Sequence, residues 1–347
     1  MIKNVLIIRF RRVGDSILSM ALCHSLKLSF SGVRVDLVLN DVIAPLFEGH
    51  PDVDRVIAFS KAECQGRNYF RKVRQVMRAT EYDAIIDMRA TPKTLLFSVL
   101  APKTRYRIGR GKWYNRGVLN FRLPRGLPGD MVERDLSFMD PLGREGELKK
   151  DREFRIYVGE EERASYRRYM ESKGVDFGKP VVLACVATRI AEKAWDAGNM
   201  TEILRRILHD TNAQIVLNYI GKEEEACARG YYERLGENPR IFMDVEAPGL
   251  RQLCALCSLS DFFFGNEGGL RHLSQALGIP SYAIFPAGIS IDTWLPGRCE
   301  RYNGISADEE VVSEGLHRAS YEERMKRITV DKVWGRLRSS LERYLYR

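Results

Sequence analysis

The stretch NVLIIRFRRVGDSILSMALCHSLK, residues 4–27, decides the fold of this chain. It opens with an apolar run at 5–8 that is short enough for a buried strand, and apolar residues recur at helical spacing after residue 15. Between the two lie basic and small residues and one carboxylate: Arg9, Arg11, Arg12, Gly14 and Asp15. The pattern predicts a strand, a basic loop and a helix, with the carboxylate where the loop meets the helix.

Asp15 has two interpretations, which do not exclude each other. In open α/β sheets ligands bind in the crevice beyond the carboxyl ends of the strands, so a carboxylate in this loop is a candidate for chemistry. Aspartate is also a favoured N-cap residue, and aspartates at helix starts usually serve as caps. The local sequence leaves both interpretations open.

Length and composition suit a protein of two domains. At 347 residues the chain exceeds one ordinary domain and matches two of about 150 residues, and 45% of its residues are apolar. No apolar run approaches the ~18 residues of a membrane span, and the sequence enters a strand pattern at once, without the features of a signal peptide. We therefore expect a cytoplasmic protein.

The seven cysteines are scattered and odd in number, which is not the pattern of a disulfide framework. Cys254 and Cys257 form a lone C-x-x-C, without the second pair or the histidines that a zinc site needs. We expect both on the buried face of a helix in a reducing compartment, and we expect no metal site.

The net charge of +9 is unevenly distributed along the chain. Residues 1–125 hold 23 Lys and Arg against 10 Asp and Glu, whereas the remainder holds 32 against 36. Such an asymmetry indicates that the first part meets an anionic partner: phosphorylated lipid, a membrane surface or nucleic acid. A well-solvated basic surface is the alternative. Nucleic acid is disfavoured because the sequence shows no helix-turn-helix, RNA-recognition motif or zinc finger.

Strand-like and helix-like segments alternate twice along the chain, which predicts an α/β fold with two parallel sheets. A strand is also expected at 154–158, and a polar helix at 160–172. The glycines, Asp176 and Pro180 of 173–180 make this segment the best candidate linker. After it, the alternation restarts with the apolar strand pattern of 180–187, and an amphipathic helix is expected at 330–346.

Two further stretches carry candidate site residues. The segment GNEGGLRH at 265–272 follows an apolar strand pattern, and its glycines would let a phosphate approach the N–H groups of a helix start. Within it, Glu267 can equally be a cap, and His272 can be a core histidine. Thr188, Arg189 and Lys193 follow the strand pattern of 180–187, where a hydroxyl and cations suit a diphosphate. A surface lysine is the alternative for Lys193.

Together these stretches resemble glycosyltransferase family 9, the bacterial lipopolysaccharide heptosyltransferases, over nearly the whole chain. Four motifs carry the resemblance: IIRF-x-x-VGD-x-(I/L)L at 7–18, ERDLSFMDPLG at 133–143, TR-x-x-x-K-x-W at 188–195 and GNEGGLRHLSQALGIP at 265–280. In the last motif many members read G-N-D-(S/T)-G-x-x-H. This chain departs from that pattern, with Glu267 in place of the aspartate and Gly268 in place of the hydroxyl residue.

The resemblance implies the GT-B fold, in which two Rossmann-like parallel-sheet domains face a central cleft. We expect an acceptor-binding domain at 1–172 and a nucleotide-sugar-binding domain at 173–329. A C-terminal helix at 330–347 is expected to pack back toward the first domain.

The resemblance also implies roles for individual residues. Asp15 matches the general base toward the acceptor hydroxyl, and Lys193 assists the leaving diphosphate. Donor binding is assigned to Thr188, Arg189, Lys193, Glu223, Asn266, Glu267, Gly268, Gly269 and His272. Acceptor binding is assigned to Arg9, Arg11, Arg12 and Gly14. The register of the ribose-binding acid is ambiguous among Lys222, Glu223 and Glu224, of which we choose Glu223.

The expected function is that of an inverting, metal-independent glycosyltransferase. It would move heptose from ADP-heptose, its substrate rather than a cofactor, onto a lipopolysaccharide core or a related surface glycan. The anionic glycolipid acceptor would place the protein at the inner-membrane surface, as a peripheral protein. The alternative is a catalytically degenerate glycolipid-binding protein of surface-polysaccharide assembly, because Glu267 and Gly268 alter the donor motif.

Overall fold

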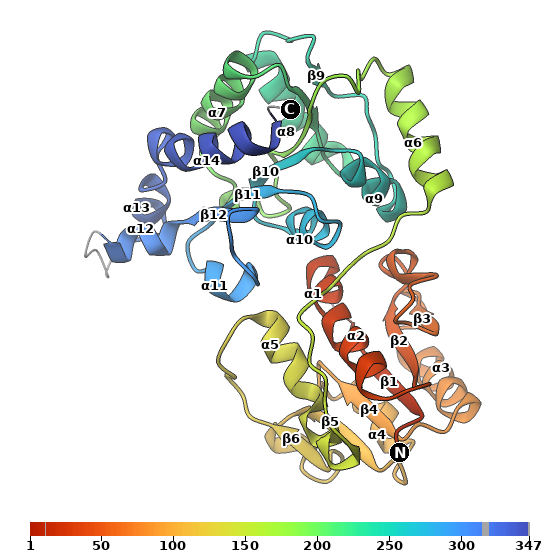
Figure 1. The fold of residues 1–347 in the computed structure, drawn as a ribbon. Helices are drawn as coiled ribbons and strands as arrows, with labels where there is room; N and C mark the ends of the chain where they lie inside the picture. The colour runs from red at the N-terminus through yellow and green to blue at the C-terminus, as the bar shows by residue number, and fades with distance from the viewer. Residues whose placement is uncertain (11, 314–318, 346–347) are drawn as a thin grey trace. The chain divides into compact units, whose positions relative to one another are not determined.

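The computed structural model describes residues 1–10, 12–313 and 319–345 (Figure 1). The chain divides into two compact units, Met1–Ile156 and Tyr157–Arg347, here called unit 1 and unit 2. Each unit is built around a sheet of six strands, and every strand pairing in both sheets is parallel. The predicted α/β fold with two parallel sheets is therefore confirmed.

The sheet of unit 1 has the strand order β3-β2-β1-β4-β5-β6. Its central strands are almost wholly buried, because helices cover both faces of a parallel sheet, and β1 and β4 are also almost wholly apolar. The strands are β1 (Asn4–Ile8), β2 (Arg34–Asn40), β3 (Arg55–Phe59), β4 (Ala84–Asp87), β5 (Tyr106–Arg110) and β6 (Phe121–Leu123).

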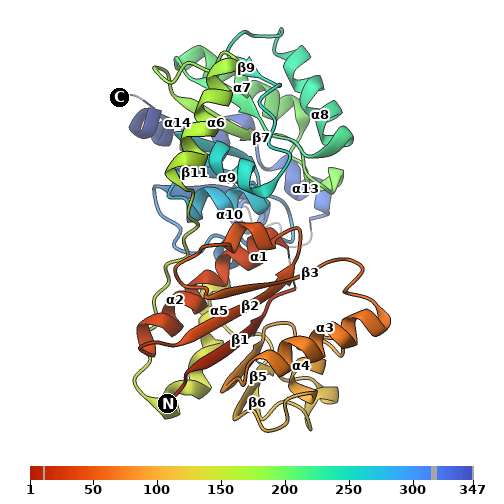
Figure 2. The same ribbon diagram turned by 90° about the vertical axis from the view of Figure 1, so that its right-hand side faces the viewer.

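Helices lie on both faces of this sheet (Figure 2). On one face an aromatic cluster of Phe59, Tyr69 and Phe97 joins β3 to the two helices α3 and α4. The expected helix at 42–49 is only a single 3₁₀ turn. The helical elements are α1 (Val13–Leu18), α2 (Met20–Ser29), η1 (Ala44–Phe47), α3 (Gly66–Ala79), α4 (Leu96–Val99), η2 (Trp113–Asn115), α5 (Met131–Leu136) and η3 (Ser137–Glu145).

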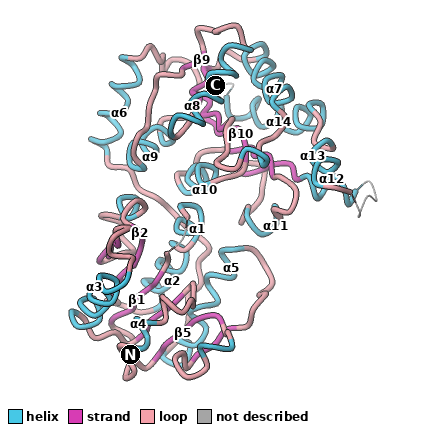
Figure 3. The backbone as a smooth tube through the Cα atoms, turned by 180° about the vertical axis from the view of Figure 1, so that it is seen from behind, coloured by secondary structure: helices cyan, strands magenta, loops and turns pink. Residues whose placement is uncertain are grey.

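The sheet of unit 2, whose strands are magenta in Figure 3, has the strand order β12-β11-β10-β7-β8-β9, which repeats the topology of unit 1. In both sheets the first strand and the fourth strand of the unit lie side by side at the centre. The strands are β7 (Val181–Cys185), β8 (Gln214–Leu217), β9 (Ile241–Phe242), β10 (Phe262–Asn266), β11 (Ser281–Phe285) and β12 (Tyr302–Ser306).

The helices of unit 2 also form two layers. The core on one face of the sheet includes residues of α7, α8 and α14, whereas α9 packs against α6 and α10. No helix in the described part of the chain is long and apolar enough to cross a bilayer. The helical elements are α6 (Glu160–Ser172), η4 (Ala191–Lys193), α7 (Ala197–Asp210), α8 (Gly221–Arg234), α9 (Leu250–Ser258), α10 (Gly269–Ala276), α11 (Ile291–Trp294), α12 (Ala307–Ser313), α13 (Tyr321–Lys326) and α14 (Val330–Leu345).

Two details differ from the sequence expectations. The division between the units falls before α6, because α6 packs against α9 and Glu162 accepts hydrogen bonds from Arg251. The expected strand at 154–158 does not form, and the segment joins neither of the two sheets and leads into α6. The predicted C-terminal helix is present as α14, which buries Leu337 and Leu341 in the core of unit 2. Its packing toward the first domain stays a prediction.

Gly265, at the end of β10, is required by the packing of the sheet. Its φ is +152°, and a Cβ at this position would lie 2.3 Å from the carbonyl oxygen of Cys185 on β7. This contact involves main chain on both sides, so no side chain can move to relieve it. Any larger residue must separate two central strands just where the candidate loops leave the sheet.

Replacing Gly265 with alanine is expected to lower the free energy of unfolding by roughly 3 kcal/mol, because the clash adds to the backbone strain. Urea unfolding followed by circular dichroism measures the change. Gly230→Ala is the matched control: Gly230 lies in α8 with open space around it, so alanine should stabilise by up to about 1 kcal/mol. Equal stability of the Gly265 variant and the parent would contradict the role given to this glycine.

Candidate functional site

The strand order places a topological switch point beside the first strand of each unit. In unit 1, β1 pairs with β2 on one side and with β4 on the other. In unit 2, β7 likewise lies between β8 and β10. Ligands of open α/β sheets bind beyond the carboxyl ends of the strands at such points. The sequence-predicted residues of unit 1 follow β1, and those of unit 2 follow β7 and β10, so both groups border a switch point. Glu223, which follows β8, is the exception.

Asp15 lies in the first turn of α1, directly beyond β1, and only 6% of its surface is exposed. Arg12, not Asp15, is the N-cap residue of this helix, and no side chain caps it. The N-cap interpretation of Asp15 is therefore wrong. A carboxylate in the first turn still benefits from the positive end of the helix dipole, which stabilises its negative charge.

Arg9 fixes the loop that carries Asp15. Its guanidinium donates to the main-chain carbonyl of Asp15 from Nε, at 3.1 Å, and from Nη2, at 2.9 Å. Nη2 also lies 3.6 Å from Oδ1 of Asp15 and donates to Oδ2 of Asp135 at 2.9 Å. Arg9 is 3% exposed, and Asp135 on α5 is fully buried. These contacts make Arg9 a positioning residue for Asp15, and its predicted contact with the acceptor stays a prediction.

The other predicted acceptor residues differ in exposure. Arg12 is exposed, whereas Gly14 is buried inside α1. Arg11 lies outside the described residues. Among the residues of this loop that the structure describes, Arg12 is therefore the cation that a ligand in solution can reach.

In unit 2, the loop after β7 carries Thr188, Arg189 and Lys193. The Thr188 hydroxyl donates to the carbonyl of Ile190 at 2.6 Å, which closes a tight turn. Arg189 is exposed, and Lys193 is half-buried at the end of η4. The charge of Lys193 contributes to lowering the pKa of Glu267, so the first and second candidate stretches of unit 2 lie near each other.

Asn266 attaches this loop to β10. Its Oδ1 accepts from the main-chain N–H of Trp195 at 2.9 Å, and its Nδ2 donates to the carbonyls of Cys185 and Val186. The indole of Trp195 is buried and donates to the carbonyl of Ile328 at 2.9 Å. The side chain of Asn266 is thus committed to the main chain of the protein, and its predicted donor contact stays a prediction.

Glu267, Gly268 and Gly269 form the turn from β10 into α10. Gly268 is the N-cap residue and offers no side chain to the helix, so no side-chain bond caps the first turn. Nε2 of the buried His272 lies 3.5 Å from Oε1 of Glu267. Burial alone would raise the pKa of Glu267, but the bond with His272 and the nearby Arg271 and Lys193 hold that pKa below its ordinary value. The turn therefore combines an ionised carboxylate with an uncapped helix start.

Arg271 is a fully buried arginine that sequence reasoning did not single out. It donates to Oε1 of Gln275 at 2.7 Å and to the carbonyl of Trp294, and it contacts the ring of His272. Burial lowers its pKa to about 10, so the group remains charged at neutral pH. A buried charge is costly when it is unpaired. The hydrogen bond from Arg271 to the carbonyl of Trp294 therefore holds the segment after β11 against α10. Position 271 is variable in the family motif, so the motif gave no signal for it.

The ribose-binding acid remains a choice between neighbours at the start of α8. Glu223 is exposed, whereas Glu224 is half-buried and accepts from the main-chain N–H of Ile220 at 2.8 Å. Glu224 and Glu267 both contribute to raising the pKa of Cys185, which places Glu224 toward the switch point. The prediction of Glu223 is untested, and the burial pattern favours Glu224.

The expected burial of Cys254 and Cys257 on α9 is confirmed. Burial raises the pKa of each thiol to about 12, so neither is a reactive thiolate at neutral pH. Oγ of Ser274 lies 3.2 Å from Sγ of Cys257. Within residues 1–10, 12–313 and 319–345, no group of three or more His, Cys, Asp or Glu side chains is placed to hold a metal ion.

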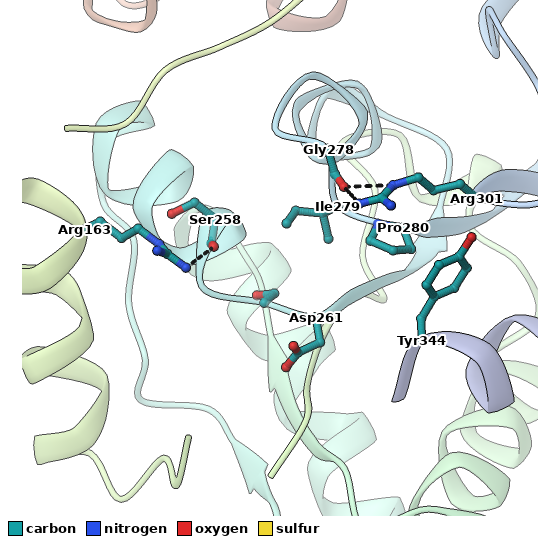
Figure 4. A pocket seen from close by; sticks show the side chains of 9 residues that line it. Arg163, Ser258, Asp261, Gly278, Ile279, Pro280, Arg301 and Tyr344 are labelled. Atoms are coloured by element: carbon teal, nitrogen blue, oxygen red, sulfur yellow. Dashed lines mark hydrogen bonds between the residues drawn. The ribbon is translucent and has the colours of Figure 1, made fainter. Parts of the chain in front are cut away.

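A pocket of about 280 Å³ in unit 2 lies at the amino ends of the strands, opposite the edge that carries the candidate residues (Figure 4). It is lined by residues that precede β10, β11 and β12, such as Asp261 and Arg301, and therefore faces the amino ends of the strands. Two arginines at its rim donate to main-chain carbonyls at the ends of helices α9 and α10, Arg163 to Ser258 and Arg301 to Gly278. These contacts satisfy helix C-termini, and the pocket is separate from the candidate donor residues.

Comparison with known proteins assigns the chain to a family. The sequence model of glycosyltransferase family 9 (heptosyltransferase) matches residues 70–320. The chain belongs to glycosyltransferase family 9. A lipopolysaccharide heptosyltransferase 3 of Escherichia coli is 22% identical over 293 residues, which are 82% of this chain and 83% of that protein.

Solved structures of the same family share the fold of this family 9 protein. The glycosyl transferase family 9 structure from Veillonella parvula has a TM-score of 0.80 at 15% identity and covers 98% of each chain. E. coli heptosyltransferase WaaC with ADP-2-deoxy-2-fluoro heptose has a TM-score of 0.65 at 18% identity, over 97% of this chain and 99% of the other. The expected GT-B fold class is thereby confirmed.

Asp87 is a second buried group of this family 9 protein that the sequence did not reveal. It ends β4 beside Ile8 of β1, and its Oδ1 accepts from the N–H groups of Arg89 and Ala90 at 3.0 and 2.7 Å. Burial raises its pKa from 3.8 to about 6, although these bonds oppose the shift. In the sequence it is only the last polar residue of a strand pattern, which carries no functional signal.

The contribution of Asp87 to the free energy of unfolding is expected to fall as pH rises from about 4 to about 6, because Asp87 is ionised in the unfolded chain before it is ionised in the folded one. The loss should approach about 3 kcal/mol, since each pKa unit corresponds to about 1.4 kcal/mol. Asp87→Asn should remove this slope in urea titrations at several pH values. The exposed Asp41→Asn should keep the slope of the parent. An unchanged slope in Asp87→Asn would assign the pH dependence to other groups.

Removing Asp135 should leave the buried charge of Arg9 without its shortest ionic contact. We expect Asp135→Leu to destabilise the protein by about 3 kcal/mol, measured by urea unfolding. The double variant Arg9→Met/Asp135→Leu carries no stranded charge and should recover most of this loss. If the double variant is as unstable as the single one, the cost comes from lost packing and not from the ion pair.

Proposed function

We propose that this chain is an inverting glycosyltransferase that transfers heptose from ADP-heptose to an anionic, lipid-linked glycan acceptor such as a lipopolysaccharide core. One observation carries the proposal: a carboxylate lies at the switch point of unit 1, and a cation with a glycine turn lies at the switch point of unit 2. An acid–base group and a diphosphate site are the two parts that glycosyl transfer needs.

Asp15 is the proposed general base. It takes the proton of the acceptor hydroxyl while the hydroxyl oxygen bonds to the anomeric carbon of the donor, on the face opposite the diphosphate. The bond between that carbon and the diphosphate oxygen breaks, and its electron pair leaves with the diphosphate. General-base assistance of this kind contributes about 10²–10⁴-fold in rate. The contacts of Arg9 support this role, because they fix the main chain that carries the carboxylate.

Lys193 and the N–H groups at the start of α10 are the proposed partners of the leaving diphosphate. Oriented donors in place before the reaction stabilise charge that develops on the leaving group without reorganising during the step. The absence of a capping side chain at Gly268 supports the proposal, because the first-turn N–H groups of α10 are left for a ligand. The buried charge of Arg271 behind this turn adds to the same positive field.

The donor and acceptor are inferred from relatives and from charge. The E. coli relative of known structure was solved with an ADP-heptose analogue, and the curated relative is a lipopolysaccharide heptosyltransferase. The excess of cations within residues 1–125 supports an anionic acceptor bound by unit 1. An acceptor of this kind would keep the enzyme at the membrane surface, on the cytoplasmic side where nucleotide sugars are made.

Asp15→Asn tests the proposal. The amide keeps the size of the side chain but cannot accept the proton, so we expect kcat to fall about 10²–10⁴-fold while ADP-heptose binding stays intact. Turnover is measured by ADP release with a lipopolysaccharide-core acceptor, and binding is measured by calorimetry. Asp41→Asn, an exposed aspartate of the same unit, is the control and should retain the parent rate.

Two results would contradict this assignment. Turnover of Asp15→Asn near the parent rate would remove Asp15 from the role of base. No binding of ADP-, GDP- or UDP-sugars by the parent would instead favour the degenerate glycolipid-binding protein, which the pairing of Glu267 with His272 makes a specific alternative. In that protein the altered turn would no longer hold a donor.

A further inference from the structure

The outer face of helix α3 differs in composition from the other long helices of this chain. Between Gly66 and Ala79 the helix contains five Lys and Arg and no Asp or Glu. Its apolar stripe of Tyr69, Val73 and Val76 packs under the sheet of unit 1. The opposite stripe is exposed, and it consists of Arg67, Phe70, Arg71, Arg74 and Arg78, which we call the α3 face.

The arginines of the α3 face have no carboxylate partner within the described residues. Lys72, at the side of the helix, pairs with Glu63 at 3.0 Å, whereas none of the four arginines takes part in an ion pair. Arg71 is 3.3 Å from Oδ1 of Asn68, a neutral group. Four cations spaced one turn apart repel one another, which costs stability.

Other exposed helices of this chain avoid such repulsion. Arg205 and Arg206 both pair with Glu202 on α7, and α8 and α14 carry the same kind of pair. Pairing between neighbouring turns is therefore the usual arrangement on this protein's surface. Its absence from α3 singles out a surface whose cations meet no counter-charge among the residues that the structure describes.

An apolar side chain lies in the middle of these cations. Phe70 is 47% exposed between Arg67 and Arg71. Val99 is 51% exposed on α4, which packs beside α3 (Figure 2). Helices that lie in the headgroup region of a bilayer combine basic residues with exposed apolar residues, which enter the acyl boundary. A nucleic-acid backbone would satisfy the arginines but would give Val99 no apolar partner.

We propose that the α3 face docks on a bilayer of anionic phospholipids. The arginines bind headgroup phosphates, and Phe70 and Val99 insert between the lipids. The proposal deepens the proposed function and rests on it for its purpose, since docking would hold the enzyme where a lipid-linked acceptor lies. The chemistry of the surface itself depends only on α3 and α4.

The test is co-sedimentation of the full chain with vesicles made of equal parts of phosphatidylglycerol and phosphatidylcholine, and with vesicles of phosphatidylcholine alone. We expect binding to the anionic vesicles that weakens with salt. Arg71→Glu/Arg74→Glu should reduce binding at least about tenfold, because each reversed charge loses its attraction and adds repulsion. Phe70→Ser should reduce the binding that persists at high salt.

The matched control is Arg205→Glu/Arg229→Glu, which makes the same change in net charge on exposed positions of α7 and α8. It should change binding less than about twofold. Both double variants should remain folded by circular dichroism and should bind ADP-heptose as the parent does, so a failure of docking is distinguishable from a failure of the proposed function. The proposal is overturned if the parent shows no preference for anionic vesicles or if the control loses as much binding as the α3 variant. Tighter binding of duplex nucleic acid than of vesicles at the same salt would also overturn it.

Discussion

The parallel hydrogen bonding of the two central strands is the constraint on which each unit of this protein depends. Because β1 and β4 run in the same direction, as do β7 and β10, their carboxyl ends meet at one edge of the sheet. The chain must leave that edge on opposite faces, and a crevice opens between the departing loops. Every motif of the family that was recognised in the sequence, except the one at 133–143, lies on one of these loops. The motif at 7–18 therefore lies at the carboxyl edge of the sheet of unit 1, and the motifs at 188–195 and 265–280 lie at the equivalent edge of the sheet of unit 2.

Buried arginines give these loops their fixed shape. In unit 1, Arg9 joins the loop after β1 to Asp135 on α5. In unit 2, Arg271 joins α10 to the segment around Trp294. A buried guanidinium is costly when it loses its hydrogen bonds, so the bonds that each of these residues makes leave few alternative loop conformations. In each unit, the buried arginine thus fixes the conformation of the loop that carries the candidate site residues.

The sequence predicted the elements better than it predicted their contacts. The strands were recognisable because a parallel strand is a continuous apolar run, and the glycine turn after β10 is encoded locally. The partner of Arg9 was not predictable, because Asp135 lies far along the chain and nothing nearby indicates the pairing. The wrong expectation of a strand at 154–158 has the same cause. Its residues have strand propensity, but whether another strand lies beside them depends on residues far along the chain. The choice between Glu223 and Glu224 depended on the phase of a helix, which a polar sequence does not fix.

The hydrogen bond from the indole of Trp195 to the carbonyl of Ile328 has a consequence for synthesis on the ribosome. The loop that carries Lys193 emerges early, but its anchor is made long after, when residue 328 has left the exit tunnel. Until then the strands of unit 2 can pair while this loop still lacks its indole partner. A nascent chain would therefore hold paired strands before the loop after β7 is anchored, and the core of unit 2 would be complete only after α14 has also emerged.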